Sequence, residues 1–509
     1  MREPSERTTV AIVGYGPVGG ALANLLARQG VDVAIIEQYK KMYPLPRAGG
    51  LVPESLRLFQ ALGLAERLFP GMVEWTFWWD VFDKDWNKVL ERKPDLGQSL
   101  QGWPHNIMFL QPKFEAALRQ ENERLGIVAH LGYRVSAIAE EGDGFELMLS
   151  PVDGDGKPRR LRADWVIGCD GDHSTVREVI GGGQEDFGRD DAYLIIHLRV
   201  IREGVKLPDR IFEWANPDRA VTYVTPFPDN LRIFEFRVLP GETKEELTAP
   251  DKIWELLSPW LKPGDAELVR AVVWHFHSRV ANRWRRGRLL IAGDAAHVMT
   301  PSLGEGLNSG FRDVMNLGWK LGAVINGTLE EAVLDTYQQE RRPHVRVLVQ
   351  MSNALKNAVL AIADNPDTYS ANLAIDRVFA APRPPINYGM HGEAPPPVGT
   401  ISDQPRLASG VLLDDFVGYH FAVVADETLL AAANIDADPV WRALGAVKIP
   451  ASDPAVRAWL DRLDVAAIVV RPDRYIFGVA DSVEELAGIR AILEKYLTKD
   501  ARASSLTMS

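Results

Sequence analysis

The stretch Val10-Ala-Ile-Val13 followed by Gly14-Tyr-Gly-Pro-Val-Gly19 decides the fold, because an apolar run passes directly into a glycine-rich turn. A helical pattern of apolar residues continues to Gly30, and a second apolar run from Val33 ends at Glu37. This order of strand, turn, helix and strand is a βαβ unit. The start of the chain therefore predicts a Rossmann-like α/β domain.

The glycine turn has the residue types that bind a dinucleotide. Gly14 permits the tight turn, Gly16 lets backbone amides approach a pyrophosphate, and Gly19 lets the helix pack on its strand. Glu37 stands 23 residues after Gly14, where an acidic side chain binds the hydroxyls of an adenosine ribose. A purely structural turn with a surface Glu is the alternative. On this motif alone, NAD and FAD both fit.

Composition narrows the class of protein. The chain has 509 residues, 46% of them hydrophobic and 25% charged, which is typical of a globular protein of several domains. The net charge of -12 argues against nucleic acid, whose binding depends on clustered Lys and Arg. Without a membrane-length apolar run or a signal peptide, we expect a cytoplasmic protein that does not contact a membrane. The single cysteine, Cys169, excludes a disulfide-dependent flavin reductase.

Three later segments place strand ends and Gly/Asp turns in a pattern that has no role in a simple nicotinamide dehydrogenase. With them, the sequence resembles the single-component FAD-dependent aromatic hydroxylases, the group of para-hydroxybenzoate hydroxylase and phenol hydroxylase. The resemblance covers nearly the whole chain and is greatest for the 3-(3-hydroxyphenyl)propionate hydroxylases. The three segments that carry the resemblance to the whole group are Cys169–Arg177, Gly287–His297 and Pro301–Asn308. The likeness to the 3-(3-hydroxyphenyl)propionate hydroxylases is carried by Phe234–Glu242, Asn308–Asp313 and Asp335–Arg342.

The resemblance implies an α/β fold with a Rossmann-like FAD-binding domain, an inserted α+β substrate domain with antiparallel strands, and a thioredoxin-like C-terminal domain. Because the C-terminal domain has no cysteine, it is expected to have a structural role or to support a homodimer. Six prolines predict an extended connector before it, outside any core. The expected parts are the FAD-binding domain in 1–185 and 285–380, the substrate domain in 186–284, the connector in 381–397 and the thioredoxin-like domain in 398–509.

The resemblance also implies roles for single residues. Asp294 would bind the ribityl chain of FAD, and the backbone amides of Gly304 to Asn308, at a helix start, would face the pyrimidine end of the flavin. Asp170 would lie near the pyrophosphate, with Arg177 bracing its turn. The residues expected to bind the cofactor are Gly14, Gly16, Pro17, Val18, Gly19, Glu37, Arg47, Gly50, Gln111, Asp170, Asp294, Gly304, Gly306, Leu307 and Asn308.

Two residues are expected to meet the substrate. The carbonyl of Pro301 would face the substrate ring, and Arg219 would bind an anionic tail of a phenolic acid bidentately. A solvated turn residue is the alternative for Arg219. Glu305 stands where many relatives have an uncharged or basic residue, and we expect its carboxylate to point to solvent. His297 is expected to hold its loop, and no metal site is expected.

The implied reaction is the hydroxylation of a small phenolic aromatic compound, such as a phenolic acid, through a flavin carbon-4a hydroperoxide. O2 would be the co-substrate and either NADH or NADPH the electron donor. One alternative is a FAD-dependent reductase or dehydrogenase that uses no oxygen. The other is a non-enzymatic flavin-binding interaction protein.

Overall fold

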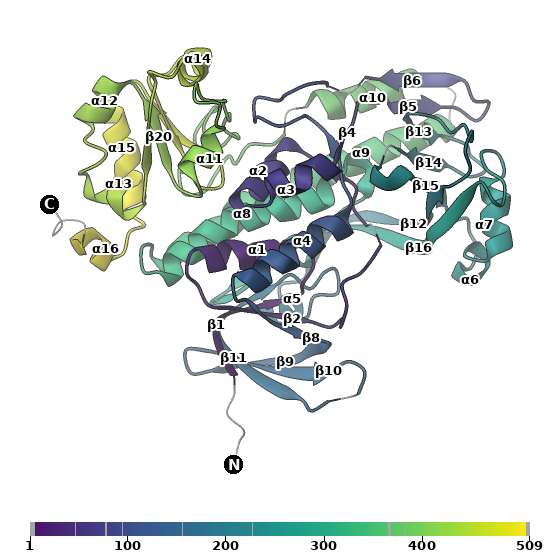
Figure 1. Cartoon of the computed structure of the whole chain (residues 1–509), viewed down its shortest axis with the longest axis horizontal. Helices are drawn as coiled ribbons and strands as arrows, with labels where there is room; N and C mark the ends of the chain where they lie inside the picture. The colour runs from purple at the N-terminus through teal and green to yellow at the C-terminus, as the bar shows by residue number, and fades with distance from the viewer. Residues whose placement is uncertain are drawn as a thin grey trace.

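A computed structural model describes residues 6–45, 47–76, 79–93, 95–154, 156–225, 227–364, 368–381 and 383–504. Figure 1 shows a first sheet at the bottom of the molecule, long helices across its centre, a second sheet on the right and a C-terminal domain on the left. The central helices therefore lie between the sheets and hold them together.

The predicted βαβ unit forms the middle of the first sheet. Its strands β1 (Glu6–Val13) and β2 (Val33–Glu37) pair in parallel, and α1 (Pro17–Arg28) is the helix between them. The strands are buried on both faces, which explains their unbroken apolar runs. The sheet order is β17 (Arg285–Arg286), β18 (Leu289–Ile291), β11 (Arg159–Gly168), β1, β2 and β8 (Val128–Leu131), with β10 (Gly144–Pro151) and β9 (Tyr133–Glu141) attached to β11.

Helices cover this sheet and carry short elements of the same domain. The helix α1 packs against both α8 (Glu305–Ile325) and α4 (Gln111–Arg124). A small separate sheet holds the loop that follows β2. The further elements are α2 (Pro53–Ala61), α3 (Ala65–Leu68), α5 (Thr175–Ile180), β3 (Gly50–Leu51), β7 (Ile107–Met108) and β4 (Val73–Glu74).

The predicted antiparallel domain forms a second, eight-stranded sheet. Two of its strands, β5 and β6, come from residues 79–92, so the sheet uses a segment outside 186–284 and inside the range 1–185 that we assign to the FAD-binding domain. The order is β19 (His297–Val298), β16 (Ala266–Ala281), β12 (Gln184–Val200), β15 (Leu231–Arg237), β14 (Val221–Val224), β13 (Ile211–Trp214), β5 (Trp79–Phe82) and β6 (Lys88–Arg92).

The two faces of the second sheet pack against different helices. Leu194 and Phe234 point to one face, where short helices cover them. Val81 and Ile211 point to the opposite face, which packs against two long helices, the first of which also contacts α8. The short helices are α6 (Lys244–Leu247) and α7 (Pro250–Leu257), and the long ones are α9 (Asp335–Asp364) and α10 (Thr368–Ala380).

The C-terminal domain has the predicted thioredoxin-like arrangement of a mixed four-stranded sheet with helices around it. The central strand β20 pairs in parallel with β21 and antiparallel with β22. Its elements are α11 (Leu413–Val417), β20 (Ala422–Ala425), α12 (Glu427–Ala432), α13 (Pro439–Ala443), β21 (Val447–Pro450), α14 (Pro454–Leu463), β22 (Ala467–Val470), β23 (Ile476–Ala480), α15 (Val483–Glu494) and α16 (Lys499–Ser504).

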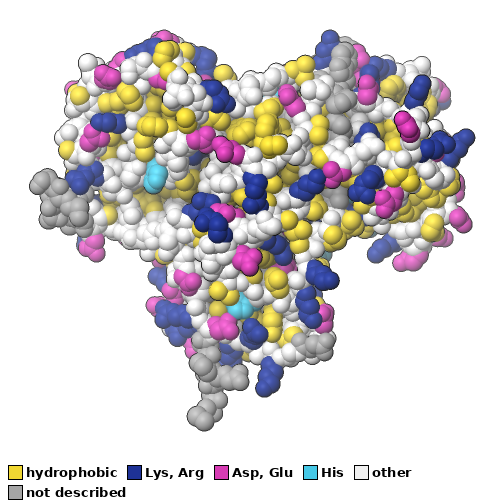
Figure 2. Space-filling view, viewed as in Figure 1, with side chains coloured by type: hydrophobic (Ala, Val, Ile, Leu, Met, Phe, Trp, Pro, Cys, Tyr) yellow, Lys and Arg dark blue, Asp and Glu magenta, His cyan; other side chains and the backbone are white. Residues whose placement is uncertain are grey.

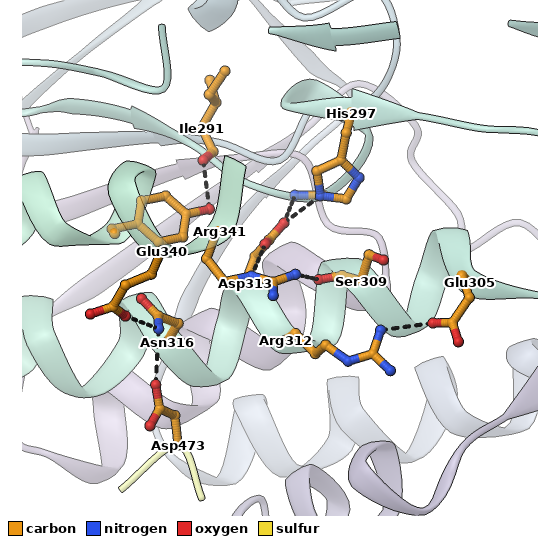
Figure 3. Close-up of polar contacts among 12 residues, drawn as sticks. Ile291, His297, Glu305, Ser309, Arg312, Asp313, Asn316, Glu340, Arg341 and Asp473 are labelled. Carbon is orange, nitrogen blue, oxygen red and sulfur yellow. Dashed lines mark hydrogen bonds and ion pairs between the residues drawn. The ribbon is translucent and has the colours of Figure 1, made fainter. Parts of the chain in front are cut away.

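A buried charge network joins this domain to the central helices. Arg471, in the turn between β22 and β23, donates to both carboxylate oxygens of Glu340 on α9 at 2.9 and 2.8 Å. Lys320 of α8 contacts the same carboxylate at 2.7 Å, and Asn316 bridges it to Asp473 (Figure 3). The network gives the C-terminal domain a structural role, while support of a homodimer stays a prediction.

The proline-rich connector is more closely packed than expected. Within its described part, residues 381 and 383–397, there is no helix or strand, as predicted, but the side chains of Ile386 and Met390 are buried. The backbone amide of Met390 donates to Glu340 at 3.2 Å. The expectation that the connector lies outside a core is therefore wrong, because the connector passes over the charge network and helps to cover it. Pro382 lies outside the described residues.

Two surface observations complete the description. No helix in the described parts of the chain is long and apolar enough to cross a membrane. On the face that Figure 2 shows, Lys and Arg side chains lie among Asp and Glu side chains rather than in one basic patch. The mixed charge of this face agrees with the net charge of -12.

We predict that Arg471→Ala destabilises the protein strongly. The substitution leaves Glu340 and Asp473 buried with fewer donors, which costs about 3–5 kcal/mol. Arg490→Ala is the matched control, because Arg490 pairs with Asp438 and Glu494 near the surface and its loss costs at most about 1 kcal/mol. Urea unfolding followed by circular dichroism measures both. Equal losses for the two variants would contradict the role given to the network.

Candidate functional site

The first turn of the site is built around three glycines. Gly14 has a φ of +103°, and a Cβ on it would lie 2.3 Å from the carbonyl oxygen of Cys169. A Cβ on Gly19 would lie 2.1 Å from the carbonyl oxygen of Gly14. Gly16 has no atom within 4 Å of such a position, and α1 starts next to it with no side-chain cap. Open space and free amides therefore meet at the start of α1, where a pyrophosphate can bind.

Glu37 lies at the rim of the same turn, at the end of β2. Its carboxylate accepts hydrogen bonds from the backbone amides of Tyr15 at 2.8 Å and Tyr39 at 2.9 Å. These bonds fix the carboxylate beside the glycine turn, in a half-buried position. Glu37 is therefore placed where the ribose of a bound dinucleotide would lie.

The second turn follows β11 and is held by Asp170 and Arg177. Asp170 accepts from the Ser174 hydroxyl at 2.5 Å and from the Thr175 amide at 2.8 Å, so its carboxylate caps α5. Arg177 donates to the carbonyl oxygens of Asp172 and, at 3.0 Å, Ala295. Arg177 thus joins the second turn to the third, while Asp170 shapes its turn rather than offering a free carboxylate.

The third turn, with Asp294, is anchored by a buried carboxylate on α8. Asp313 accepts from the Gly293 amide at 3.0 Å, from His297 Nε2 at 2.7 Å and from Arg341 Nε at 2.9 Å (Figure 3). Burial raises the pKa of Asp313, but His297 and Arg341 outweigh it and hold that pKa below its ordinary value. His297 therefore holds its loop, in agreement with the structural role expected for it.

Asp294 itself remains accessible beside this anchor. Its side chain is exposed to solvent. Protein atoms on several sides still remove part of the water around the carboxyl group, and this desolvation raises its pKa. Val18 of α1 lies under the turn, because a Cβ on Gly293 would be 3.0 Å from the Val18 side chain. The first and third turns are therefore in direct contact, with Asp294 free to bind a ligand.

The start of α8 supplies a further set of backbone amides. Gly304 has a φ of +65°, caps the helix without a side-chain hydrogen bond, and is followed by Gly306 and the half-buried Leu307. No atom lies within 4 Å of a Cβ position on Gly306. Asn308 donates to the Gly304 carbonyl at 2.7 Å and accepts from the Ser55 hydroxyl at 2.6 Å. The helix start is therefore rigid, open and positively polarised.

The loop after β2 lies between these amides and the second sheet. Gln111 accepts from the Ala48 amide at 2.9 Å and so fixes the loop near Gly50, whose carbonyl accepts from Asn308 at 3.3 Å. The guanidinium of Arg47 is exposed and stacks over the Tyr43 ring at 4.4 Å from its centroid. Arg47 is thus close to the site but held by an aromatic contact rather than by an ion pair.

Glu305 corrects one expectation. Its side chain is fully buried rather than solvated, and it contacts Arg312 at 2.7 Å (Figure 3). It also contacts Arg383 at 2.8 Å. Burial raises the pKa of Glu305, but the two guanidinium groups hold it below its ordinary value. Arg312 lies seven residues later on the same face of α8, and Arg383 comes from the connector. The contact with the connector depends on the folded chain, which explains the wrong expectation.

The two residues expected to meet the substrate have different surroundings. Pro301 is exposed in a short 3₁₀ turn before α8, and its carbonyl accepts from the Gly304 amide at 2.8 Å. Arg219 is bound within the β domain, to both oxygens of Glu242 and, at 2.8 Å, to the carbonyl of Arg237. The structure therefore brings Pro301 together with the cofactor residues, but not Arg219.

Sequence reasoning missed Asp313 and Arg341. Both stand in segments that carry the resemblance, Asn308–Asp313 and Asp335–Arg342, yet neither is given a role there. A charged residue within an otherwise buried helix is the signal that identifies them, since such charges are buried only in pairs. Among the described residues, no group of three or more His, Cys, Asp or Glu is placed to hold a metal ion.

The residues present fit FAD. An open glycine turn with Glu37 at its rim suits the adenosine and pyrophosphate, an accessible Asp294 suits the ribityl hydroxyls, and a polarised helix start suits the electron-rich pyrimidine ring. The three parts are linked by Val18, Arg177 and Asp313, so one extended ligand can reach all of them.

We predict that Asp294→Ala weakens FAD binding. Loss of its hydrogen bond with the buried ribityl chain costs about 1–3 kcal/mol, or roughly a 5–150-fold higher Kd. Quenching of flavin fluorescence during reconstitution of the FAD-free protein measures the Kd. Asp436→Ala is the control, because Asp436 is an exposed residue of the C-terminal domain that pairs with Lys448. An unchanged Kd for Asp294→Ala would remove this residue from the site.

A second prediction concerns Glu305→Gln. Since the pKa of Glu305 is lowered in the folded protein, its charge stabilises the fold at neutral pH, and this contribution is lost as the pH falls through the lowered pKa. The variant should lose about 1.5–3 kcal/mol of unfolding free energy at neutral pH, and less in acid. Chemical unfolding at several pH values tests this, with the exposed Glu427→Gln as the control. A loss independent of pH would contradict the ionised pair.

Comparison with known proteins agrees with this fit. The family model described as FAD binding domain matches residues 7–352. A protein of Rhodococcus jostii (strain RHA1) named "Probable NADH-specific resorcinol 4-hydroxylase" is 34% identical, over 94% of this chain and 93% of its own length. The "3-(3-hydroxy-phenyl)propionate/3-hydroxycinnamic acid hydroxylase" of Mycolicibacterium smegmatis (strain ATCC 700084 / mc(2)155) is also 34% identical, over 94% of this chain and 92% of its own.

Solved structures share the fold. Aklavinone-11 hydroxylase, in a ternary complex with FAD and aklavinone, matches with a TM-score of 0.77 and 23% identity, over 96% of this chain and 99% of that one. The flavin-dependent monooxygenase PieE, in complex with FAD and substrate, matches with a TM-score of 0.81 and 18% identity, over 97% and 99%. From the family model and the relatives of the preceding paragraph, the chain belongs to the FAD-dependent aromatic hydroxylases, within the family of the FAD binding domain.

Proposed function

We propose that this protein hydroxylates a small, uncharged phenol, with NADH as the electron donor. The relatives named for resorcinol and for 3-(3-hydroxyphenyl)propionate both act on a ring with a hydroxyl group, according to their names. One of the two is named as NADH-specific. Both names therefore support a substrate ring that carries a hydroxyl group, and the first name supports NADH as the electron donor.

The position of Pro301 is the observation that carries the proposal. Its exposed segment lies directly before the helix start that suits the pyrimidine ring, and it also packs against α9 under the second sheet. A ring bound beside Pro301 therefore lies next to the flavin ring and faces that sheet. FAD bound there would supply the redox chemistry by which NADH reduces O2, so that one oxygen atom of O2 enters the ring and the other leaves as water.

The chain's own residues would bind and orient the reactants. The Pro301 carbonyl already accepts from Gly304, and its second lone pair remains able to accept a hydrogen bond from the phenolic hydroxyl of the neutral substrate, before the proton leaves. The amides at the start of α8 would stabilise negative charge on the pyrimidine ring of bound FAD. The two flanking layers, the second sheet and α9, keep bulk water from the ring.

The surroundings of Arg219 favour an uncharged substrate over a phenolic acid. Its guanidinium is bound bidentately by Glu242, which already neutralises its charge within the β domain. Arg219→Ala should therefore leave the KM for an aromatic acid unchanged. A KM increased several-fold would restore the role first expected for Arg219.

The central test measures how much NADH and O2 the protein consumes when the phenol is added. We expect resorcinol to consume NADH and O2 in equal amounts and to give hydroxylated product, whereas an analogue without the ring hydroxyl should give mainly hydrogen peroxide. The hydroxyl matters because ring attack on an electrophilic oxygen needs electron donation from a phenolate. NADH oxidation, oxygen uptake, peroxide and product are measured together. Turnover of resorcinol without oxygen uptake, or no turnover of any uncharged phenol, would contradict the proposal.

A further inference from the structure

A row of polar side chains crosses the second sheet on the face that packs against α9. Glu213 of β13 lies opposite Thr222 of β14, and Thr222 lies opposite Glu235 of β15. Directly opposed residues in an antiparallel pair share a face. Glu213 also lies opposite Val81, which is packed against α9, so the whole row has the same orientation.

Two further side chains complete this row. Tyr193 of β12 is two residues before Ile195, which lies opposite Glu235, so the Tyr193 side chain shares the face. Lys356 of α9 places its Nζ 4.6 Å from the centroid of the Tyr193 ring and 3.9 Å from a Glu213 oxygen. Both side chains are buried. We call these five residues the polar row: Tyr193, Glu213, Thr222, Glu235 and Lys356.

The polar row contains more acceptors than its own donors satisfy. Glu213 accepts from the Thr222 hydroxyl at 2.6 Å and is the carboxylate nearest to Lys356. Among the described residues, none donates a well-formed hydrogen bond to Glu235, and the buried Tyr193 hydroxyl has only a weak contact with the Lys356 ammonium. One ammonium therefore faces two carboxylates, and two polar groups remain available for a ligand.

The polar row lies close to Pro301. Ser352 is one helical turn before Lys356 on α9, and its hydroxyl donates to the Thr300 carbonyl at 2.8 Å. The Thr300 hydroxyl lies 2.7 Å from that of Ser352. Thr300 directly precedes Pro301, so the same stretch of α9 contacts the Pro301 segment and the polar row. A ring beside Pro301 would thus extend toward the part of the sheet that carries Glu235 and Tyr193.

We propose that Glu235 is the base that accepts the proton of the substrate phenol, with Tyr193 donating a hydrogen bond to the resulting phenolate and Lys356 as a positioning residue. The inference rests on the proposed function and assigns a residue to one step of it. The phenolic O–H bond breaks as a new O–H bond forms on Glu235. The negative charge moves from the carboxylate to the phenolate, so atoms and charge balance.

The electrostatics of the polar row suit this transfer. Burial raises the pKa of Glu235 to about 7, with Lys356 acting against the shift and Glu213 adding to it. Tyr193, on the neighbouring strand, is a further titratable group on the same face of the sheet as Glu235. A base whose pKa lies near neutral pH is effective in general base catalysis. A phenol has an ordinary pKa near 10, and a cation such as Lys356 lowers that pKa by about 1–3 units. The difference between the pKa of the phenol and that of Glu235 is then smaller.

Infrared difference spectroscopy tests the proton transfer without turnover. The FAD-loaded protein is mixed with resorcinol at a mildly alkaline pH, where Glu235 is ionised before binding. We expect a protonated-carboxyl band to appear for the natural protein and for the exposed control Glu203→Gln, but not for Glu235→Gln. A band that persists in Glu235→Gln, or that is missing from the natural protein, overturns the assignment.

The acidity of the phenol gives a second, kinetic test. Glu235→Gln should lower kcat/KM for resorcinol by about 10²–10⁴-fold and abolish the pH-dependent step near neutrality. It should lower kcat/KM much less for a fluorinated phenol that is already ionised in solution. An equal loss for both phenols would assign Glu235 a merely structural role. If the natural protein hydroxylates no phenol, the proposed function fails instead.

Tyr193→Phe provides an independent variant with almost unchanged shape. We expect about tenfold weaker binding of resorcinol from the loss of one hydrogen bond, with the infrared carboxyl band retained. Unchanged affinity would exclude the Tyr193 hydroxyl from the substrate site. FAD content and circular dichroism show that each variant is folded.

Discussion

The buried carboxylate of Asp313 is the interaction on which the rest of the site depends. It joins the Gly293 turn, His297 and Arg341, which belong to the first sheet, the edge of the second sheet and α9. A carboxylate in such a place is stable only while all its donors remain, because an unpaired buried charge is very costly. Asp313 is therefore one point at which the two sheets and α9 are held together, and the cofactor site lies directly beside it.

Local patterns are enough to predict the nucleotide-binding part of the fold. The apolar runs around Gly14 and Gly19 specify a buried parallel sheet, since the side chains that decide it are neighbours in sequence. The burial of Glu305 escapes such patterns because one of its partners, Arg383, is far away in sequence and becomes a neighbour only after folding. The role proposed for Glu235 could not be predicted from local patterns for a similar reason, because Tyr193, Glu213 and Lys356, which surround it, are distant in sequence.

The C-terminal domain shows how a domain without redox chemistry can still matter to an oxidoreductase. Arg471 contacts Glu340, which in turn contacts Lys320, and these two residues lie on the same two helices that carry Arg341 and Asp313. The thioredoxin-like domain therefore packs on the side of these two helices that is opposite the cofactor site and stabilises them there. Its contribution is mechanical support, delivered through paired charges in a low-dielectric interior.

The strands β5 and β6 affect how the chain can fold during synthesis. Residues 79–92 are made early, yet their partner strand β13 starts at Ile211 and the helices that cover them end at Ala380. The first sheet is equally divided, because β18 comes long after β1. Neither domain is complete until most of the chain has left the ribosome. A β5–β6 hairpin that forms early therefore has exposed strand edges until β13 is synthesised. A fragment that ends after residue 185 would keep these exposed edges permanently.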